Sequence, residues 1–128
     1  MNATAFFVIA VTALAMDAVW LTFRNDYHQS LFRSIQHSAL IPRILPAIGI
    51  YLLIPAVLTF YAVQPSHTVQ ESILKGAVIG AILYGFYELT NYATFTNWTL
   101  SMVVSDTLWG TVLCGIASGV GAYVVLKK

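Results

Sequence analysis

The chain has 128 residues, of which 59% are hydrophobic and only 9% are charged. A soluble domain carries about 25% charged residues, so this composition argues against a soluble globular fold. Six Lys and Arg against five Asp and Glu leave a net charge of +1, which gives no basic surface for nucleic acid. Cys114 is the only cysteine and the three histidines are scattered, so we expect neither a disulfide nor a metal site nor a cofactor.

Four apolar segments are long enough to cross a bilayer, for which about 20 residues suffice. They cover residues 4–23, 44–63, 72–95 and 100–126. Because backbone groups in hydrocarbon must be hydrogen-bonded internally, each segment is predicted to be a helix. The sequence therefore predicts an all-α, polytopic membrane protein, a four-helix transmembrane bundle that forms one integral membrane domain over residues 1–128.

The first segment carries an acidic residue within its apolar run. Asp17 lies on one helical stripe with Trp20, and Arg24 comes next along the same stripe. Charged side chains in membrane spans generally face the interior of the bundle, so Asp17 is predicted to point inward. Trp20 has the position expected for the aromatic belt at a membrane interface.

The connector of residues 24–43 is long for a helical hairpin, and its apolar residues alternate with Arg and His. This amphipathic pattern predicts a helix that lies in the membrane interface. Arg24, Arg33 and Arg43 are candidates for contacts with lipid headgroups. Alternatively, Arg24 or Arg33 dips into the bundle and neutralises a carboxylate.

The second segment has no ionisable side chain apart from tyrosines, so we expect it to contribute packing. Pro55 should kink it or loosen it locally. The third segment ends in "LYGFYELTNYATFTNW", where Glu88 interrupts an aromatic and aliphatic run. A carboxylate in hydrocarbon costs at least about 2.5–3.5 kcal/mol. Tyr84, Glu88 and Asn91 share one stripe and are predicted to face inward.

The fourth segment repeats a pattern of the first. Asp106 is followed three residues later by Trp109, as Asp17 is by Trp20. Trp109 is expected to form the wall of a pocket or to donate its indole N–H to a carboxyl group. Two GxxxG patterns, at residues 76–80 and 115–119, predict that the third and fourth helices pack more closely there than around Glu88 and Asp106.

The three acidic residues share one depth. If side A is the side of the N-terminus and side B the opposite one, each carboxyl lies roughly 9–10 Å below the B-side interface, at about 1.5 Å per residue. No histidine is expected at that depth. The sequence predicts an intramembrane acidic cluster, with the candidate binding residues Asp17, Trp20, Tyr84, Glu88, Asn91, Asp106 and Trp109.

Three stretches carry a resemblance to a known family. "LAMDAVWL", "YELTNYATFTNW" and "VVSDTLWGTVL" resemble motifs of the small membrane family called domain of unknown function 2177, along the whole chain. Glu88 stands where that family usually has Asp. The resemblance implies a four-helix membrane fold and no established activity. The positions that match its motifs are Asp17, Trp20, Leu21, Tyr87, Leu89, Thr90, Asn91, Ala93, Thr94, Trp98, Asp106, Trp109, Gly110 and Thr111.

Three functions are compatible with these features. The first is a small binding or transport unit for a proton, a cation or a lipid, in which the acids titrate or bind. The second is a structural subunit of a membrane assembly, in which the acids are interhelical hydrogen-bond locks. The third is an enzyme that modifies membrane lipids, or its accessory protein, with the acids as an acid–base pair. The third ranks lowest, because no histidine is expected beside the acids.

The sequence indicates the binding partners of the protein and its orientation in the membrane less directly than its fold. We expect contacts with membrane lipids, and self-association or a larger membrane complex is open. Arg24, Arg33 and Arg43 on side B balance three lysines on side A, so the positive-inside count is a tie. The paired lysines Lys127 and Lys128 and the free amine favour cytoplasmic termini.

Overall fold

The computed structural model describes residues 1–126, and these residues are helical apart from short connections. The elements are α1 (Ala3–Phe23), α2 (Asn25–Gln36), α3 (Ile44–Leu58), the π-helical turn η1 (Thr59–Val63), α4 (Val69–Thr94) and α5 (Leu100–Leu126). Four helices, with η1 continuing α3, are long and apolar enough to cross a membrane. The predicted all-α polytopic membrane fold is confirmed. Lys127 and Lys128, on which the orientation prediction partly rests, lie outside the described residues.

Polar side chains set where two of the helices begin. The Asn2 side chain accepts the N–H of Ala5 and caps α1. The Thr68 hydroxyl accepts the N–H of Glu71, whose carboxylate in turn accepts the N–H of His67. This reciprocal capping satisfies N–H groups that have no partner inside the helix. It explains why α4 begins at Val69 rather than at the predicted residue 72.

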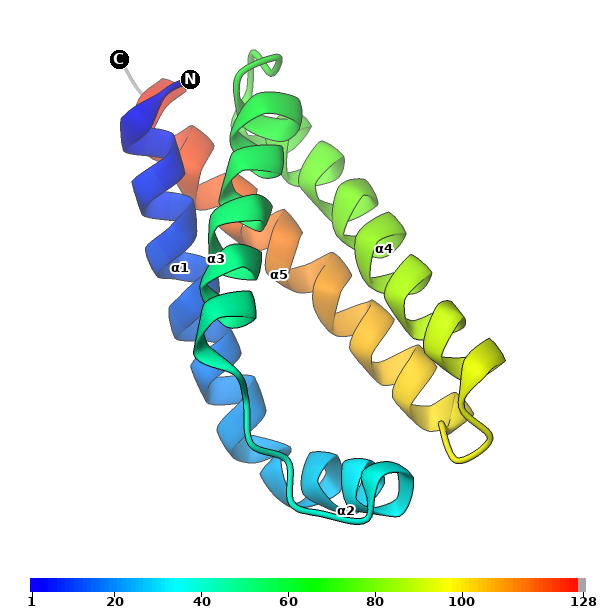
Figure 1. Ribbon diagram of the computed structural model, residues 1–128. Coiled ribbons are helices and arrows are strands. Elements are labelled where there is room, and N and C mark those ends of the chain that lie inside the picture. The colour runs from blue at the N-terminus through cyan, green and yellow to red at the C-terminus, as the bar shows by residue number, and fades with distance from the viewer. Residues whose placement is uncertain (127–128) are drawn as a thin grey trace.

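The helices place both ends of the described chain on one side of the molecule. Figure 1 shows the N-terminus, the end of α5 and the α3–α4 connection together at side A, whereas α2 and the α4–α5 connection lie at side B. The helix α5 packs against α4 and against α1, and α3 packs against α1. The turn η1 brings the end of α3 into contact with α4 and α5. Because half of its apolar stretch is buried, against 11–17% in the other spans, α5 is the central helix.

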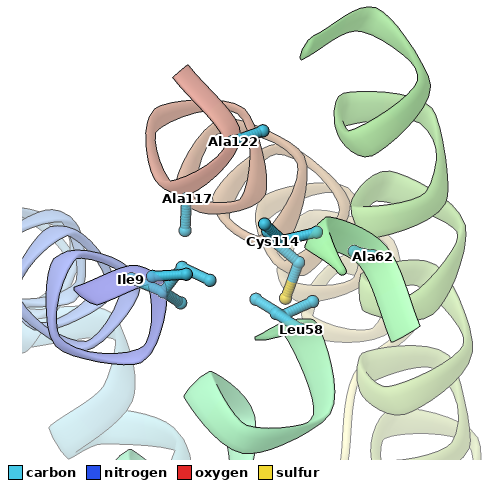
Figure 2. Packing of buried hydrophobic residues seen from close by; sticks show 8 residues of the cluster. Ile9, Leu58, Ala62, Cys114, Ala117 and Ala122 are labelled. Carbon is cyan, nitrogen blue, oxygen red and sulfur yellow. The ribbon is translucent and has the colours of Figure 1, made fainter. Parts of the chain in front are cut away.

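The main apolar core lies in the A-side half of the bundle. Figure 2 shows Ile9 of α1 and Leu58 of α3 directed at Cys114 and Ala117 of α5. The small side chains of α5 let the neighbouring helices approach its backbone closely. The acidic side chains of the spans lie outside this cluster, toward side B.

Three glycines mark close contacts between α4 and α5. A Cβ atom added to Gly76 would overlap the Ser118 side chain, and one added to Gly80 would overlap the carbonyl oxygen of Gly110. Gly110 is itself covered by the ring of Tyr84, so tight packing continues toward side B. The expected narrowing of this helix pair toward side A stays a prediction.

Helix α3 departs from regular geometry after its internal proline. Pro55 has no N–H to donate, and the π-helical turn η1 follows four residues later, with the N–H of Gln64 donating to the carbonyl of Thr59 at 2.9 Å. The turn carries Ala62 and Val63 into the core beside Leu58. The loosening expected at Pro55 therefore appears one turn further along the chain.

The connector helix α2 covers the B-side end of the α4–α5 hairpin. Leu31 packs with Trp98 and Met102 in a second apolar cluster. The Asn97 side-chain amide donates to the Ser34 carbonyl at 2.9 Å, and the hydroxyls of Tyr27 and Thr99 are 2.6 Å apart. The amphipathic helix predicted in this connector is present, and its apolar face lies on the bundle.

Candidate functional site

Glu88 is fully buried, and one of its two carboxyl oxygens has a hydrogen-bond partner. The indole N–H of Trp98 donates to Oε1 of Glu88 at 2.8 Å. Trp98 lies in the α4–α5 connection, which folds back so that the indole is only 3% exposed. The carboxyl group of Asp106 on α5 acts on that of Glu88 at short range, while Oε2 of Glu88 is buried and has no hydrogen-bond partner within residues 1–126. Inside the span, Trp98 thus satisfies one oxygen of Glu88 and Asp106 is its acidic neighbour.

The Glu88–Asp106 contact constrains the charge of both groups. Two carboxyl groups can hydrogen-bond to each other only if one of them carries a proton, because two adjacent carboxylates repel each other. No Lys, Arg or His in residues 1–126 forms an ion pair with either acid; the pair that the structure does show is Lys75–Glu71 at 2.7 Å, near side A. No cationic side chain of residues 1–126 therefore neutralises the Glu88–Asp106 pair through an ion pair.

Asp17 is held by donors from two other helices. The Tyr51 hydroxyl on α3 donates to Oδ2 at 2.7 Å, and the Trp109 indole on α5 donates to Oδ1 at 2.9 Å. Of the two roles expected for Trp109, the structure shows donation to a carboxyl group. The second span was expected to contribute only packing, and this expectation was wrong, because the phenol of Tyr51 binds an acid.

An aromatic stack lies beside Asp17. The rings of Trp20 and Trp109 are parallel within 6°, with centroids 4.7 Å apart. The guanidinium carbon of Arg24 lies 5.0 Å from the Trp20 ring centroid and 4.4 Å from that of Tyr27. Arg24 also donates to the Ser105 hydroxyl at 3.2 Å. The two D-x-x-W patterns thus meet face to face, and cation–π contacts hold Arg24 at the α1–α2 corner.

A histidine of the connector helix also lies within electrostatic range of the acids. His28 of α2 is only 6% exposed, and the charges of Asp106, Arg24 and Asp17 all act on it. Burial lowers the pKa of His28 below its ordinary value of 6.5; Arg24 lowers it further, while Asp106 and Asp17 oppose the change. The expectation that no histidine lies at the depth of the acids stays a prediction, as does the position of the connector in the membrane interface.

The remaining predicted residues have varied positions. Tyr84 packs over Gly110 within electrostatic range of Asp17 and Asp106. Asn91 was expected to serve a carboxyl group, and its side chain lies beside that of Tyr87, one turn away on α4. Arg33 and Arg43, the proposed headgroup contacts, are exposed on the B side and outside the acidic region.

Three participants were absent from the predicted set, namely Tyr51, Trp98 and His28. Trp98 had a signal, since it is one of the positions that match the family motifs. Tyr51 had none, because no pattern in its own segment points to the acids. His28 belongs to the amphipathic connector, whose Arg and His residues the sequence places on side B, above the acids. Within residues 1–126, no group of three or more His, Cys, Asp or Glu side chains is placed to hold a metal ion.

These features define a four-helix integral membrane protein whose spans hold acids bonded to aromatic donors. The chain belongs to the family described as Predicted membrane protein (domain of unknown function 2177), whose model matches residues 2–123. The resemblance found in the sequence is thus confirmed, and it places the chain in an uncharacterised membrane family. No curated protein and no solved structure matches the chain.

Proposed function

We propose that this protein is a small membrane unit that binds and releases a proton at the Glu88–Asp106 pair. The observation that carries the proposal is the buried contact between these two carboxyl groups, with no cationic side chain of residues 1–126 in an ion pair with either. When two acids lie side by side, the ionisation of one changes the proton affinity of the other. Such a pair is a proton-binding site inside the membrane.

The proton is favoured over the other ligands that the acids suggest. Trp98 already occupies Oε1 of Glu88, and Asp106 acts on the same carboxyl group at short range. A metal ion would need several ligands together, and the described residues place no three His, Cys, Asp or Glu side chains to hold one. A proton needs only the two carboxyl groups that are present.

The proposal is tested by infrared spectroscopy of the purified protein in detergent or lipid, across a pH titration. We expect a C=O stretching band of a buried protonated carboxyl group that persists at neutral pH and disappears reversibly at higher pH. Glu88→Gln should remove the band, because a glutamine amide donates to the Asp106 carboxylate without a proton. The fold should remain intact.

Glu71→Gln is the matched control, since it makes the same change at a residue paired with Lys75 near side A. The band should survive in this variant. A wild-type protein without any buried C=O band, or a band equally strong in Glu88→Gln, would contradict the proposal.

A second function is favoured by the hydrogen bonds of Asp17. Its carboxylate joins α1 to α3 through Tyr51 and to α5 through Trp109, as an interhelical lock would. Hydrogen bonds of this kind contribute about 0.6–2 kcal/mol each in membrane proteins. In this case the acids serve the stability of the bundle and of any assembly that it enters.

A double-mutant cycle measures the lock. Asp17→Leu and Trp109→Phe are each expected to destabilise the bundle, and the double variant should be less destabilised than the sum by about 0.6–2 kcal/mol. The measurement is unfolding in mixed micelles, followed by circular dichroism. Asp17→Leu combined with Trp98→Phe is the control, because Trp98 donates to Glu88 instead, and its coupling should stay within about 0.5 kcal/mol. Additive effects of Asp17→Leu and Trp109→Phe would exclude the lock.

A further inference from the structure

His28 is a buried ionisable group that the proton-binding pair does not itself require. It belongs to α2, outside the four spans, and its side chain is 6% exposed. One turn further on, Leu31 packs into the apolar cluster with Trp98 and Met102. His28 is therefore held at the contact between α2 and the bundle, between the B-side surface and the acids.

The two ring nitrogens of His28 have different surroundings. Nδ1 is buried and has no hydrogen-bond partner within residues 1–126. Nε2 also makes no hydrogen bond to these residues, yet it is not among their buried unpartnered atoms, so it keeps contact with the surface. One nitrogen thus faces the protein interior while the other reaches the solvent.

Charged side chains on α5, on α1 and at the α1–α2 corner act on His28. Asp106 of α5 and Asp17 of α1 attract a proton on the imidazole, and Arg24 at the α1–α2 corner repels it. Burial has the largest effect and lowers the pKa of His28, so the surroundings favour the neutral ring. A neutral imidazole can accept a proton at one nitrogen and donate one from the other.

We propose that His28 relays protons between the B-side water and the Glu88–Asp106 pair, an inference that rests on the proposed proton-binding function. In uptake, Nε2 takes a proton from a hydronium ion in the B-side water, which leaves a neutral water molecule, and Nδ1 gives its own proton through one water to the Asp106 carboxylate. The N–H bond at Nδ1 breaks and an O–H bond forms on Asp106. Release reverses both steps and restores the original tautomer, so no other reactant is needed.

A relay changes the rate of proton transfer. The equilibrium of proton binding is set by the Glu88–Asp106 pair itself. The measurement is time-resolved infrared spectroscopy of the carboxyl C=O band after a pH jump, on the full-length protein in lipid vesicles or nanodiscs. We expect His28→Asn to slow the band change by about tenfold or more, since positioned acid–base groups typically contribute 10²–10⁴-fold. The final amplitude of the band should remain.

The control is His37→Asn, which makes the same change at an exposed histidine near the end of α2. His37 has a φ of 60°, a conformation that asparagine adopts readily. This variant should react at the wild-type rate. His28→Ala provides a second test. Free imidazole should enter the space left by the side chain and restore the fast change of the carboxyl band.

Each outcome bears on one proposal. A wild-type rate in His28→Asn overturns the relay, and so does a slow rate that imidazole does not restore, since that result indicates a purely structural role. Absence of the titrating band in the wild-type protein overturns the proton-binding function itself. Slowing in His28→Asn, normal kinetics in His37→Asn and rescue by imidazole together support the relay.

Discussion

Replacement of Glu88 by leucine is expected to lower the free energy of unfolding by about 2–4 kcal/mol, although leucine is the better residue for a membrane span. Leucine leaves the indole N–H of Trp98 without an acceptor and Asp106 without its partner. Both groups stay in the interior, where an unsatisfied polar group costs more than the apolar side chain contributes. Unfolding in mixed micelles, monitored by circular dichroism, gives the difference.

Glutamine at the same position separates shape from hydrogen bonding. Its carbonyl accepts from Trp98 and its NH₂ group donates to Asp106, so Glu88→Gln should stay within about 1 kcal/mol of the wild type. Equal stability of the leucine and glutamine variants would show that neither partner depends on Glu88. If the acids act only as an interhelical lock, the glutamine variant should be stable and the wild type should show no titrating carboxyl band. If Glu88 and Asp106 form a proton-binding site, the wild type should show the band and the glutamine variant should lack it.

Alanine at Gly80 is expected to destabilise the bundle by about 3 kcal/mol, the upper end of the usual cost of overpacking. The new Cβ would overlap the carbonyl oxygen of Gly110 and approach the Cβ of Cys114 at 2.7 Å. A backbone carbonyl cannot turn aside as a flexible side chain can, so α4 and α5 must separate. Thermal unfolding and the yield of folded protein in detergent measure this loss.

Gly49→Ala provides the control for the same chemical change. A Cβ at Gly49 of α3 meets nothing within 4 Å, so this variant should match the wild type or be more stable by up to about 1 kcal/mol. Similar losses in both variants would mean that helix propensity, rather than the α4–α5 contact, determines the result.

Two parts of the acidic region differ in how well the sequence predicted them. The common depth assigned to Asp17, Glu88 and Asp106 rests on rise per residue and helix phase, which follow from local geometry, and it stays a prediction. Their partners could not be assigned in the same way. Tyr51 lies 34 residues from Asp17 along the chain, and Trp109 lies 92 residues away. Both contacts depend on which helices become neighbours, and periodicity within one segment does not decide this.

The sequence by itself determined the four spans, the helical connector and the inward direction of the acids. These features follow from hydropathy, from the need to satisfy backbone hydrogen bonds in lipid and from the cost of exposing a carboxylate to hydrocarbon. Only the tertiary structure decided that Glu88 pairs with Asp106 while Asp17 binds Tyr51 and Trp109. It also decided that Trp98 and His28 approach the acids, because the α4–α5 connection folds back and α2 packs beneath the bundle. Those are long-range contacts, set by the packing of separate segments rather than by any one of them.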